Sequence, residues 1–247
     1  MQSARDLSAP PALATLLQSA RHALFLDFDG TLVELAPTPD TISPVPDLAS
    51  RLETLSQRLG GALALVSGRS IADIETHIGS VSLAAAGSHG SDVRRADRSA
   101  LGTAAQQLPE TMEKALRTFA DGEGLDFEQK PHGGALHYRA NPDKGEAAQD
   151  FAKTLAVENG WSVQSGKCVV EVISGGADKG TAVVALMEEP GFAGCIPVFI
   201  GDDLTDEAGF VAASRLGGFG ILVGERETTS AAHALATVTQ VHKWLEL

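Results

Sequence analysis

Leu24-Phe25-Leu26-Asp27-Phe28-Asp29-Gly30-Thr31-Leu32 is the stretch that decides the fold of this chain. It begins as an apolar run of strand length and ends at two carboxylates, Asp27 and Asp29, one residue apart. Because side chains alternate along a strand, both carboxylates are predicted to lie on the same side, where a buried strand meets solvent. Gly30 then lets the backbone leave the strand in a conformation that other residues resist.

Two carboxylates this close repel each other unless a cation lies between them or one of them is protonated. A hard divalent ion with oxygen ligands, Mg²⁺ above all, meets that requirement. One carboxylate could then attack an electrophile while the other moves a proton, as in enzymes that form aspartyl-phosphates. A turn with two solvated Asp residues is the alternative interpretation of this stretch taken alone.

The composition is that of an ordinary globular protein with ample material for a core. The chain has 247 residues, of which 43% are hydrophobic and 21% charged, and its formal net charge is -13. That charge argues against a nucleic-acid partner, because a phosphate backbone would be repelled. A phosphorylated small molecule stays possible, since a local cluster of Lys, Arg and Mg²⁺ can override the global field.

Targeting and redox signals are weak throughout the chain. The two cysteines, Cys168 and Cys195, lie in apolar contexts and are predicted to be free thiols in a reducing compartment. No apolar run approaches the roughly 18 residues of a membrane helix, and the first 22 residues lack the basic start of a secretory signal. We therefore expect a cytoplasmic protein, a monomer, with neither a membrane nor a nucleic-acid partner.

Strands and helices alternate through most of the chain, which predicts an α/β fold with a doubly wound, Rossmann-like core sheet. Asp47 is predicted to cap a helix, and the tail from Thr229 onward is predicted to be helical. Between them the pattern changes to helices and hairpins, with a helix expected over 101–120. The predicted strands are 24–27, 62–66, 82–86, 196–200 and 219–223 in the core, and 125–130, 135–139, 161–164 and 168–173 in the insert. We expect residues 1–97 and 175–247 to form the core and residues 98–174 an inserted α+β cap domain.

Doubly wound sheets bind ligands at the carboxyl ends of their strands. Polar residues occupy those predicted ends: Asp27, Asp29, Ser67, Asp202 and Asp206, with Lys179 at the start of a helix. Most of these residues also have a plain structural interpretation. Ser67 could be a helix cap and Lys179 a solvated lysine, and the acidic residues at 202–207 could be a helix start that the helix dipole favours. Four carboxylates in the six residues 202–207 would repel strongly without a cation, which favours metal. Together these residues predict a phosphoryl-transfer site.

Four motifs resemble the haloacid dehalogenase-like phosphatases: Asp27-Phe28-Asp29-Gly30-Thr31-Leu32, Ser67-Gly68-Arg69, Lys179, and Gly201-Asp202-Asp203-x-x-Asp206. They occur in that superfamily's order across nearly the whole chain. The resemblance implies that Asp27 attacks phosphorus and that Mg²⁺ is held by Asp27, the Asp29 carbonyl and Asp202, with Asp206 nearby. It also implies that Asp29 acts as general acid and base, while Ser67 and Lys179 bind the phosphoryl oxygens.

Further runs resemble the trehalose-phosphate phosphatase subgroup: Gly87-x-His89-Gly90, Glu128-x-Lys130, His137-Tyr138-Arg139 and Gly166-Lys167-x-x-x-Glu171. They imply hydrolysis of trehalose 6-phosphate, a small-molecule sugar phosphate, to trehalose and phosphate. The cap would select the sugar. The implied substrate contacts are Arg69, His89, Glu128, Lys130, Arg139, Lys167 and Glu171. Asp92 departs from the pattern, which usually has Glu after His-Gly, so its contact near the cap hinge is in doubt.

Three other functions remain open at this level. A phosphatase for another sugar phosphate, such as sucrose 6-phosphate or a glucosylglycerol-type phosphate, would keep the core motifs and change the cap. A catalytically inactive regulatory module would be expected to lose Asp27 or Asp29, and both are present. A phosphomutase would share the aspartyl-phosphate chemistry and would need a bisphosphorylated activator.

Overall fold

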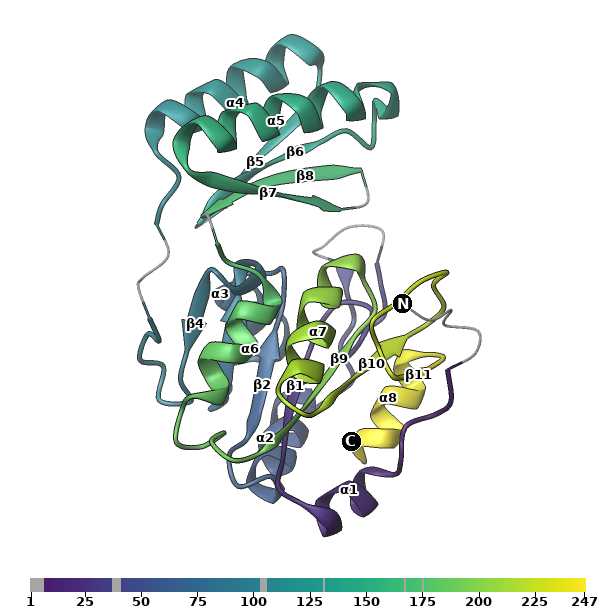
Figure 1. The fold of residues 1–247 in the computed structure, drawn as a ribbon. Helices are drawn as coiled ribbons and strands as arrows, with labels where there is room; N and C mark the ends of the chain where they lie inside the picture. The colour runs from purple at the N-terminus through teal and green to yellow at the C-terminus, as the bar shows by residue number, and fades with distance from the viewer. Residues whose placement is uncertain (1–6, 37–40, 103–105, 131, 167, 175) are drawn as a thin grey trace. The chain divides into compact units, whose positions relative to one another are not determined.

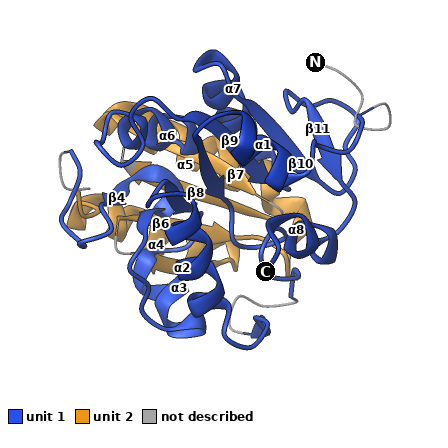
Figure 2. Ribbon diagram, turned by 90° about the horizontal axis from the view of Figure 1, so that it is seen from below, with its two compact units in different colours: residues 1–102, 178–247 blue, residues 103–177 orange. Residues whose placement is uncertain are grey.

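The computed structural model describes residues 7–36, 41–102, 106–130, 132–166, 168–174 and 176–247. The chain divides into two compact units, residues 1–102 with 178–247 and residues 103–177, drawn in two colours in Figure 2. Among the described helices, none is long and apolar enough to cross a bilayer.

The first unit is built on a seven-stranded sheet with β1, His22–Leu26, at its centre. The strand order is β11-β10-β9-β1-β2-β3-β4, and every pair is parallel except β3 with β4. All five residues of β1 are buried, as expected for a strand covered on both faces. The other strands are β2 Leu63–Val66, β3 Ala84–Gly87, β4 Asp92–Arg94, β9 Ile196–Gly201, β10 Phe219–Val223 and β11 His233–Leu235.

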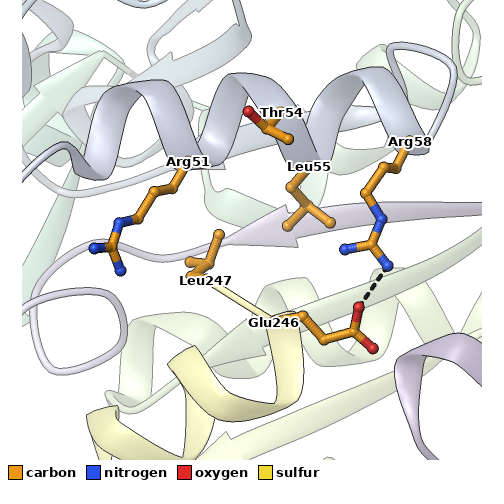
Figure 3. A pocket seen from close by; sticks show the side chains of 6 residues that line it. All are labelled: Arg51, Thr54, Leu55, Arg58, Glu246 and Leu247. Carbon is orange, nitrogen blue, oxygen red and sulfur yellow. Dashed lines mark hydrogen bonds and ion pairs between the residues drawn. The ribbon is translucent and has the colours of Figure 1, made fainter.

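Helices cover both faces of this sheet (Figure 1). They are α1 Leu13–Ser19, α2 Leu48–Arg58, α3 Ile71–Ile78, α6 Lys179–Met187, α7 Glu207–Arg215 and α8 Val238–Leu245. Helices α6 and α7 pack side by side on one face. Arg58, at the end of α2, pairs with Glu246 after α8 at 2.6 Å. A small pocket of about 160 Å³ lies beside this ion pair (Figure 3), and it contains none of the predicted site residues.

The second unit is an antiparallel sheet in the order β5-β6-β8-β7. Its elements are α4 Glu110–Glu123, β5 Asp126–Lys130, β6 Gly133–His137, α5 Gly145–Asn159, β7 Trp161–Gly166 and β8 Val169–Ser174. Leu116 of α4, Leu136 of β6 and Val172 of β8 are fully buried in one apolar cluster between helices and sheet. The predicted α/β fold, a doubly wound core with an inserted α+β unit, is confirmed.

Several local predictions were wrong. The helix expected over 101–120 begins at Glu110, because Pro109 precedes it and a proline in a helix interior costs a hydrogen bond. Asp47 does precede α2, but its backbone is left-handed (φ 60°) and its side chain makes no capping hydrogen bond. The tail after Thr229 is not helical throughout, since β11 comes before α8. The edge strand β4 was not predicted either.

Candidate active site

Asp27 follows β1 directly, at the carboxyl edge of the central strand. Its amide donates to the Ile200 carbonyl of β9 at 2.9 Å, so the backbone at this point is still part of the sheet. The residue is only 4% exposed. The sheet therefore fixes the first carboxylate of the motif rigidly and nearly out of solvent.

Gly30 makes the turn that follows possible. Its φ is +74°, and its amide donates to the Val33 carbonyl at 2.8 Å. A Cβ at this position would lie 2.2 Å from an oxygen of Asp202. Two features therefore require glycine at position 30: the positive φ of its backbone and the close approach of the Asp202 carboxylate.

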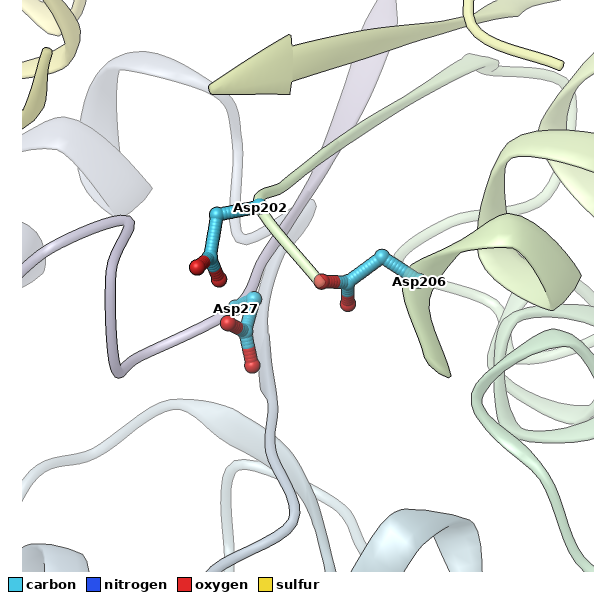
Figure 4. Close-up of side chains that lie close together, drawn as sticks. All are labelled: Asp27, Asp202 and Asp206. Atoms are coloured by element: carbon cyan, nitrogen blue, oxygen red, sulfur yellow. The ribbon is translucent and has the colours of Figure 1, made fainter. Parts of the chain in front are cut away.

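Three carboxylates converge here from two strand ends (Figure 4). Asp27, Asp202 and Asp206 each offer an oxygen within 4.8 Å of the others. Asp202 follows β9, and Asp206 closes a single 3₁₀ turn, Leu204–Asp206, just before α7. Burial and the neighbouring Asp206 charge raise the pKa of Asp27 well above its usual range. Burial, Asp206 and Asp203 raise the pKa of Asp202 to about 7.

Lys179 is the cation that this cluster contains. It is the first residue of α6 and is 3% exposed. Its Nζ donates to Asp27 at 2.7 Å and to Asp206 at 2.6 Å. Burial opposes the lysine charge, but the charges of Asp206 and Asp27 outweigh it and raise the pKa of Lys179 above its ordinary range. One buried ammonium therefore faces three carboxylates, which leaves the cluster short of positive charge.

Arg226 and Glu207, which no sequence pattern predicted as site residues, hold the loop that carries Asp202. Arg226, after β10, donates to the Asp202 carbonyl at 2.5 Å and to Glu207 at 3.1 Å. Glu207 also accepts from the Thr229 hydroxyl at 2.7 Å and from the Ser230 amide at 2.7 Å. No sequence motif marks Arg226, so only the folded chain shows that it supports this loop.

Ser67 lies at the end of β2, the strand beside β1, and is 1% exposed. Its amide donates to the Ala86 carbonyl at 2.8 Å, and its Oγ accepts from the Arg69 amide at 3.1 Å. The capping role considered for Ser67 belongs to Ser70, whose hydroxyl accepts from the Asp73 amide at the start of α3. The Ser67 hydroxyl proton therefore stays available to a phosphoryl oxygen.

Arg69 lies against Asp29. Its Nε and Nη2 donate to the two Asp29 oxygens at 2.6 and 2.7 Å, and its Nη1 donates to Asp73 at 2.7 Å. These hydrogen bonds outweigh the opposing effect of burial and raise the pKa of Arg69 above its ordinary range. The predicted substrate residue is thus the direct partner of the predicted general acid.

His89 packs on the Ser67 loop. Ser88 and His89 both have left-handed backbones, with φ of 49° and 57°. This unusual pair directs the imidazole ring against Gly68, where an added Cβ would lie 2.5 Å from the ring. Asp92, the position that departs from the subgroup pattern, pairs with Arg94 on β4 at 2.8 Å.

In the second unit, Glu128, Lys130 and Glu171 share the sheet face opposite the helices. Glu128 pairs in register with Ala135, and Ala135 with Glu171, so a small residue separates the two acids. Lys130 donates to Glu171 at 2.6 Å, and His137 lies 2.8 Å from Glu128. Arg139 lies in a bend beyond β6, in an exposed position. Lys167 lies outside the residues that the structure describes.

The fold is shared with phosphatases of the haloacid dehalogenase superfamily. A protein of that enzyme superfamily from Bacteroides thetaiotaomicron superposes with a TM-score of 0.66 at 15% identity, over 92% of this chain and 94% of that chain. Within this class, the chain belongs to the trehalose-phosphatase family, whose model matches residues 25–241.

Two proteins illustrate the relationship. The trehalose-6-phosphate phosphatase of Escherichia coli (strain K12) is 36% identical over 243 residues, covering 96% of this chain and 90% of that protein. The C-terminal domain of the C. albicans trehalose-6-phosphate phosphatase has a TM-score of 0.76 at 24% identity, covering 97% of both chains. Similarity therefore extends over nearly the whole length of the chain.

Proposed function

We propose that this chain is a Mg²⁺-dependent phosphatase that hydrolyses trehalose 6-phosphate through an aspartyl-phosphate on Asp27. The observation that carries the proposal is the buried cluster of Asp27, Asp202, Asp206 and Lys179 at the carboxyl edge of the sheet, in a chain of this family. Burying such a cluster costs free energy of folding, and a bound ligand would offset that cost.

The donor set fits Mg²⁺. Asp27, Asp202 and Asp206 provide carboxylate oxygens, which hard divalent cations prefer. Burial, followed by the charge of Asp206, raises the pKa values of Asp27 and Asp202, and Lys179 does not offset these effects. We propose that Asp27, Asp202 and the Asp29 carbonyl hold the ion, with Asp206 beside it. Bound there, Mg²⁺ would neutralise the approaching phosphoryl group and the carboxylates.

In the first step, an Asp27 oxygen attacks phosphorus and forms an O–P bond. The bond between phosphorus and the sugar oxygen breaks, and Asp29 donates a proton to that oxygen, so that trehalose leaves as a neutral alcohol. Proton transfer of this kind contributes about 10²–10⁴-fold. The Ser67 hydroxyl and the Lys179 ammonium bind phosphoryl oxygens as their charge shifts in the transition state.

In the second step, Asp29 is ionised and takes a proton from water. The water oxygen bonds to phosphorus, the bond to Asp27 breaks, and inorganic phosphate leaves, so that Asp27 is again a carboxylate and Asp29 is again the protonated acid that the first step requires. The position of Arg69 supports this role, since its two hydrogen bonds fix the orientation of the Asp29 carboxyl group. The same side chain thus acts as acid and then as base.

We propose that residues 98–174 form the cap that selects the sugar. Glu128, Lys130 and Glu171 lie on one sheet face as donors and acceptors for hydroxyl groups. A polyol that pairs with all of them is favoured, because a substrate lacking one hydroxyl leaves a polar group unpaired. The remaining proposed contacts are Arg69, His89, Arg139 and Lys167.

Phosphate release from trehalose 6-phosphate, sucrose 6-phosphate, glucose 6-phosphate and p-nitrophenyl phosphate tests the proposal, each assayed with Mg²⁺ and with EDTA. The proposal predicts Mg²⁺-dependent release that strongly favours trehalose 6-phosphate. Equal release from every ester would keep the core chemistry and overturn the substrate. Release from none would favour the regulatory alternative, and activity that needs a bisphosphorylated sugar would indicate a mutase.

A further inference from the structure

Arg69 is held between two carboxylates that lie on different elements. Its side chain is 9% exposed, whereas those of Asp29 and Asp73 are 30% and 38% exposed. One edge of the guanidinium binds Asp29 through Nε and Nη2, and Nη1 binds Asp73. The planar fork therefore has its orientation set from two directions.

Helix α3 fixes the Asp73 side of this contact. Asp73 lies in the first turn, where an acidic residue is favoured by the helix dipole, and the hydroxyl of Ser70 caps its amide. His77 is one turn further on the same helix face, with its Nε2 at 3.3 Å from Arg69 Nη1 and 3.8 Å from Asp73. Asp73 is thus a rigid support at the back of Arg69.

We propose that Asp73 is a positioning residue for the proposed reaction: through Arg69, it holds the Asp29 carboxyl in the orientation from which it transfers its proton. The inference rests on the proposed function, which gives Asp29 that role. A bidentate Arg occupies one lone pair of each Asp29 oxygen and leaves a second on each for the proton. Loss of Asp73 would let the guanidinium rotate, and Asp29 would rotate with it.

Leaving-group dependence separates this role from a merely structural one. p-Nitrophenolate departs as a stable anion and needs little help from an acid, whereas phenolate is more basic and depends on the proton. Both esters are small aryl phosphates, so sugar recognition does not enter. When both esters are assayed on one enzyme preparation, the ratio of their two kcat/KM values does not depend on the fraction of enzyme that is folded.

The experiment compares kcat/KM for phenyl phosphate and p-nitrophenyl phosphate in wild type, Asp73→Asn, Arg69→Lys and Asp29→Asn. We expect Asp73→Asn to lower the phenyl phosphate value about tenfold, a part of the ~10²–10⁴ of general acid catalysis, with a change below about twofold for p-nitrophenyl phosphate. Arg69→Lys should lower the phenyl phosphate value more than Asp73→Asn does, because the lysine ammonium cannot bind both Asp29 oxygens as the planar guanidinium does. Asp29→Asn removes the proposed acid itself and therefore sets the largest selective loss expected for phenyl phosphate.

The matched control is Glu75→Gln, which removes the same charge from the same helix and breaks a pair with Arg98 of 2.8 Å. It should leave the ratio of the two substrates unchanged. An equal loss for both substrates in Asp73→Asn, or no loss for either, would overturn the inference while leaving the proposed function in place. Failure of the wild type to release phosphate from trehalose 6-phosphate, assayed in parallel, would instead overturn the proposed function itself.

Discussion

The carboxylates of the two units have opposite electrostatic environments. In the first unit, Asp27, Asp202 and Asp206 are close together with one lysine among them, and the pKa values of Asp27 and Asp202 are raised. In the second unit, Glu128 of β5 pairs with His137 of the adjacent strand β6, and Glu171 of β8 pairs with Lys130 of β5 across the intervening strand β6. The hydrogen bond from His137, acting against burial, lowers the pKa of Glu128.

This difference indicates different partners. A cluster of like charges that the chain itself leaves unbalanced suits a cation and a phosphoryl group from solution. On the second sheet face each of the two acids has a basic hydrogen-bonding partner, and such paired groups suit a neutral, hydroxyl-rich ligand that exchanges hydrogen bonds with them. We therefore expect changes in the first unit to affect chemistry on every substrate, and changes in the second to affect the choice among substrates.

Asp27→Asn should have the largest effect. It removes the proposed nucleophile, and turnover of trehalose 6-phosphate and p-nitrophenyl phosphate should fall together by about 10³-fold or more. Phosphate release measures it, with Asp126→Asn, an exposed residue of β5, as the control. Retention of more than a tenth of the activity on either substrate would contradict the assignment.

Lys130→Met should separate the substrates. The change leaves Glu171, which is 8% exposed, without its 2.6 Å partner. We expect kcat/KM for trehalose 6-phosphate to fall by about 10²-fold, the scale of one lost charged hydrogen bond, and that for p-nitrophenyl phosphate to change little. Lys144→Met, which breaks the 2.5 Å pair with Glu123, is the control. Parallel losses on both substrates would argue against a cap role.

Magnesium should stabilise the chain in a pH-dependent way. Since the pKa of Asp202 is raised to about 7, the metal-free folded chain keeps a proton there that the unfolded chain releases near pH 4. The contribution of this group to stability therefore falls as pH rises from about 4 to about 7, while the ionised form that binds metal becomes available. At a hundredfold excess over Kd, Mg²⁺ should add about 2.7 kcal/mol.

Thermal unfolding with Mg²⁺ or EDTA measures this effect. We expect the rise in Tm caused by Mg²⁺ to be larger at pH 8 than at pH 6, and to disappear in Asp202→Asn. A rise that is independent of pH, or that survives in the variant, would show that the ion binds elsewhere.

Glu128→Gln should have the smallest effect. A lowered pKa means that the Glu128 carboxylate stabilises the folded chain above its unfolded pKa, and that this contribution is lost as pH falls through the folded value. Because the side chain is 51% exposed, the contribution should stay below about 1 kcal/mol. Urea unfolding at pH 7 and pH 3 should show a difference between wild type and variant only at pH 7. A larger loss would mean that this pair is structural.

Sequence reasoning succeeded where a motif coincides with a strand end. The apolar run before Asp27 has the length and burial of a central strand, so the predicted strand and the carboxylate after it follow from local pattern alone. It was less successful where tertiary contacts decide: β4 and β11 are only three residues long, and pairing with neighbouring strands defines them.

The contacts that support the site were the least predictable. Asp73 does follow Arg69 at helical spacing, and this signal could have been found. Arg226 lies 24 residues from Asp202 in a segment without a pattern, and only the packing of β10 beside β9 brings it to the loop. Asp47 has the residue type of a cap, but its backbone adopts a different conformation.

Detection of the phosphorylated intermediate tests the central claim most directly. Enzyme, Mg²⁺ and substrate labelled in the phosphoryl group would be mixed, quenched in acid on the millisecond scale, and digested for peptide mapping. The account predicts transient label on the peptide that contains Asp27, formed before free phosphate accumulates and absent in Asp27→Asn. Label on another residue, or continuing turnover in Asp27→Asn, would contradict it.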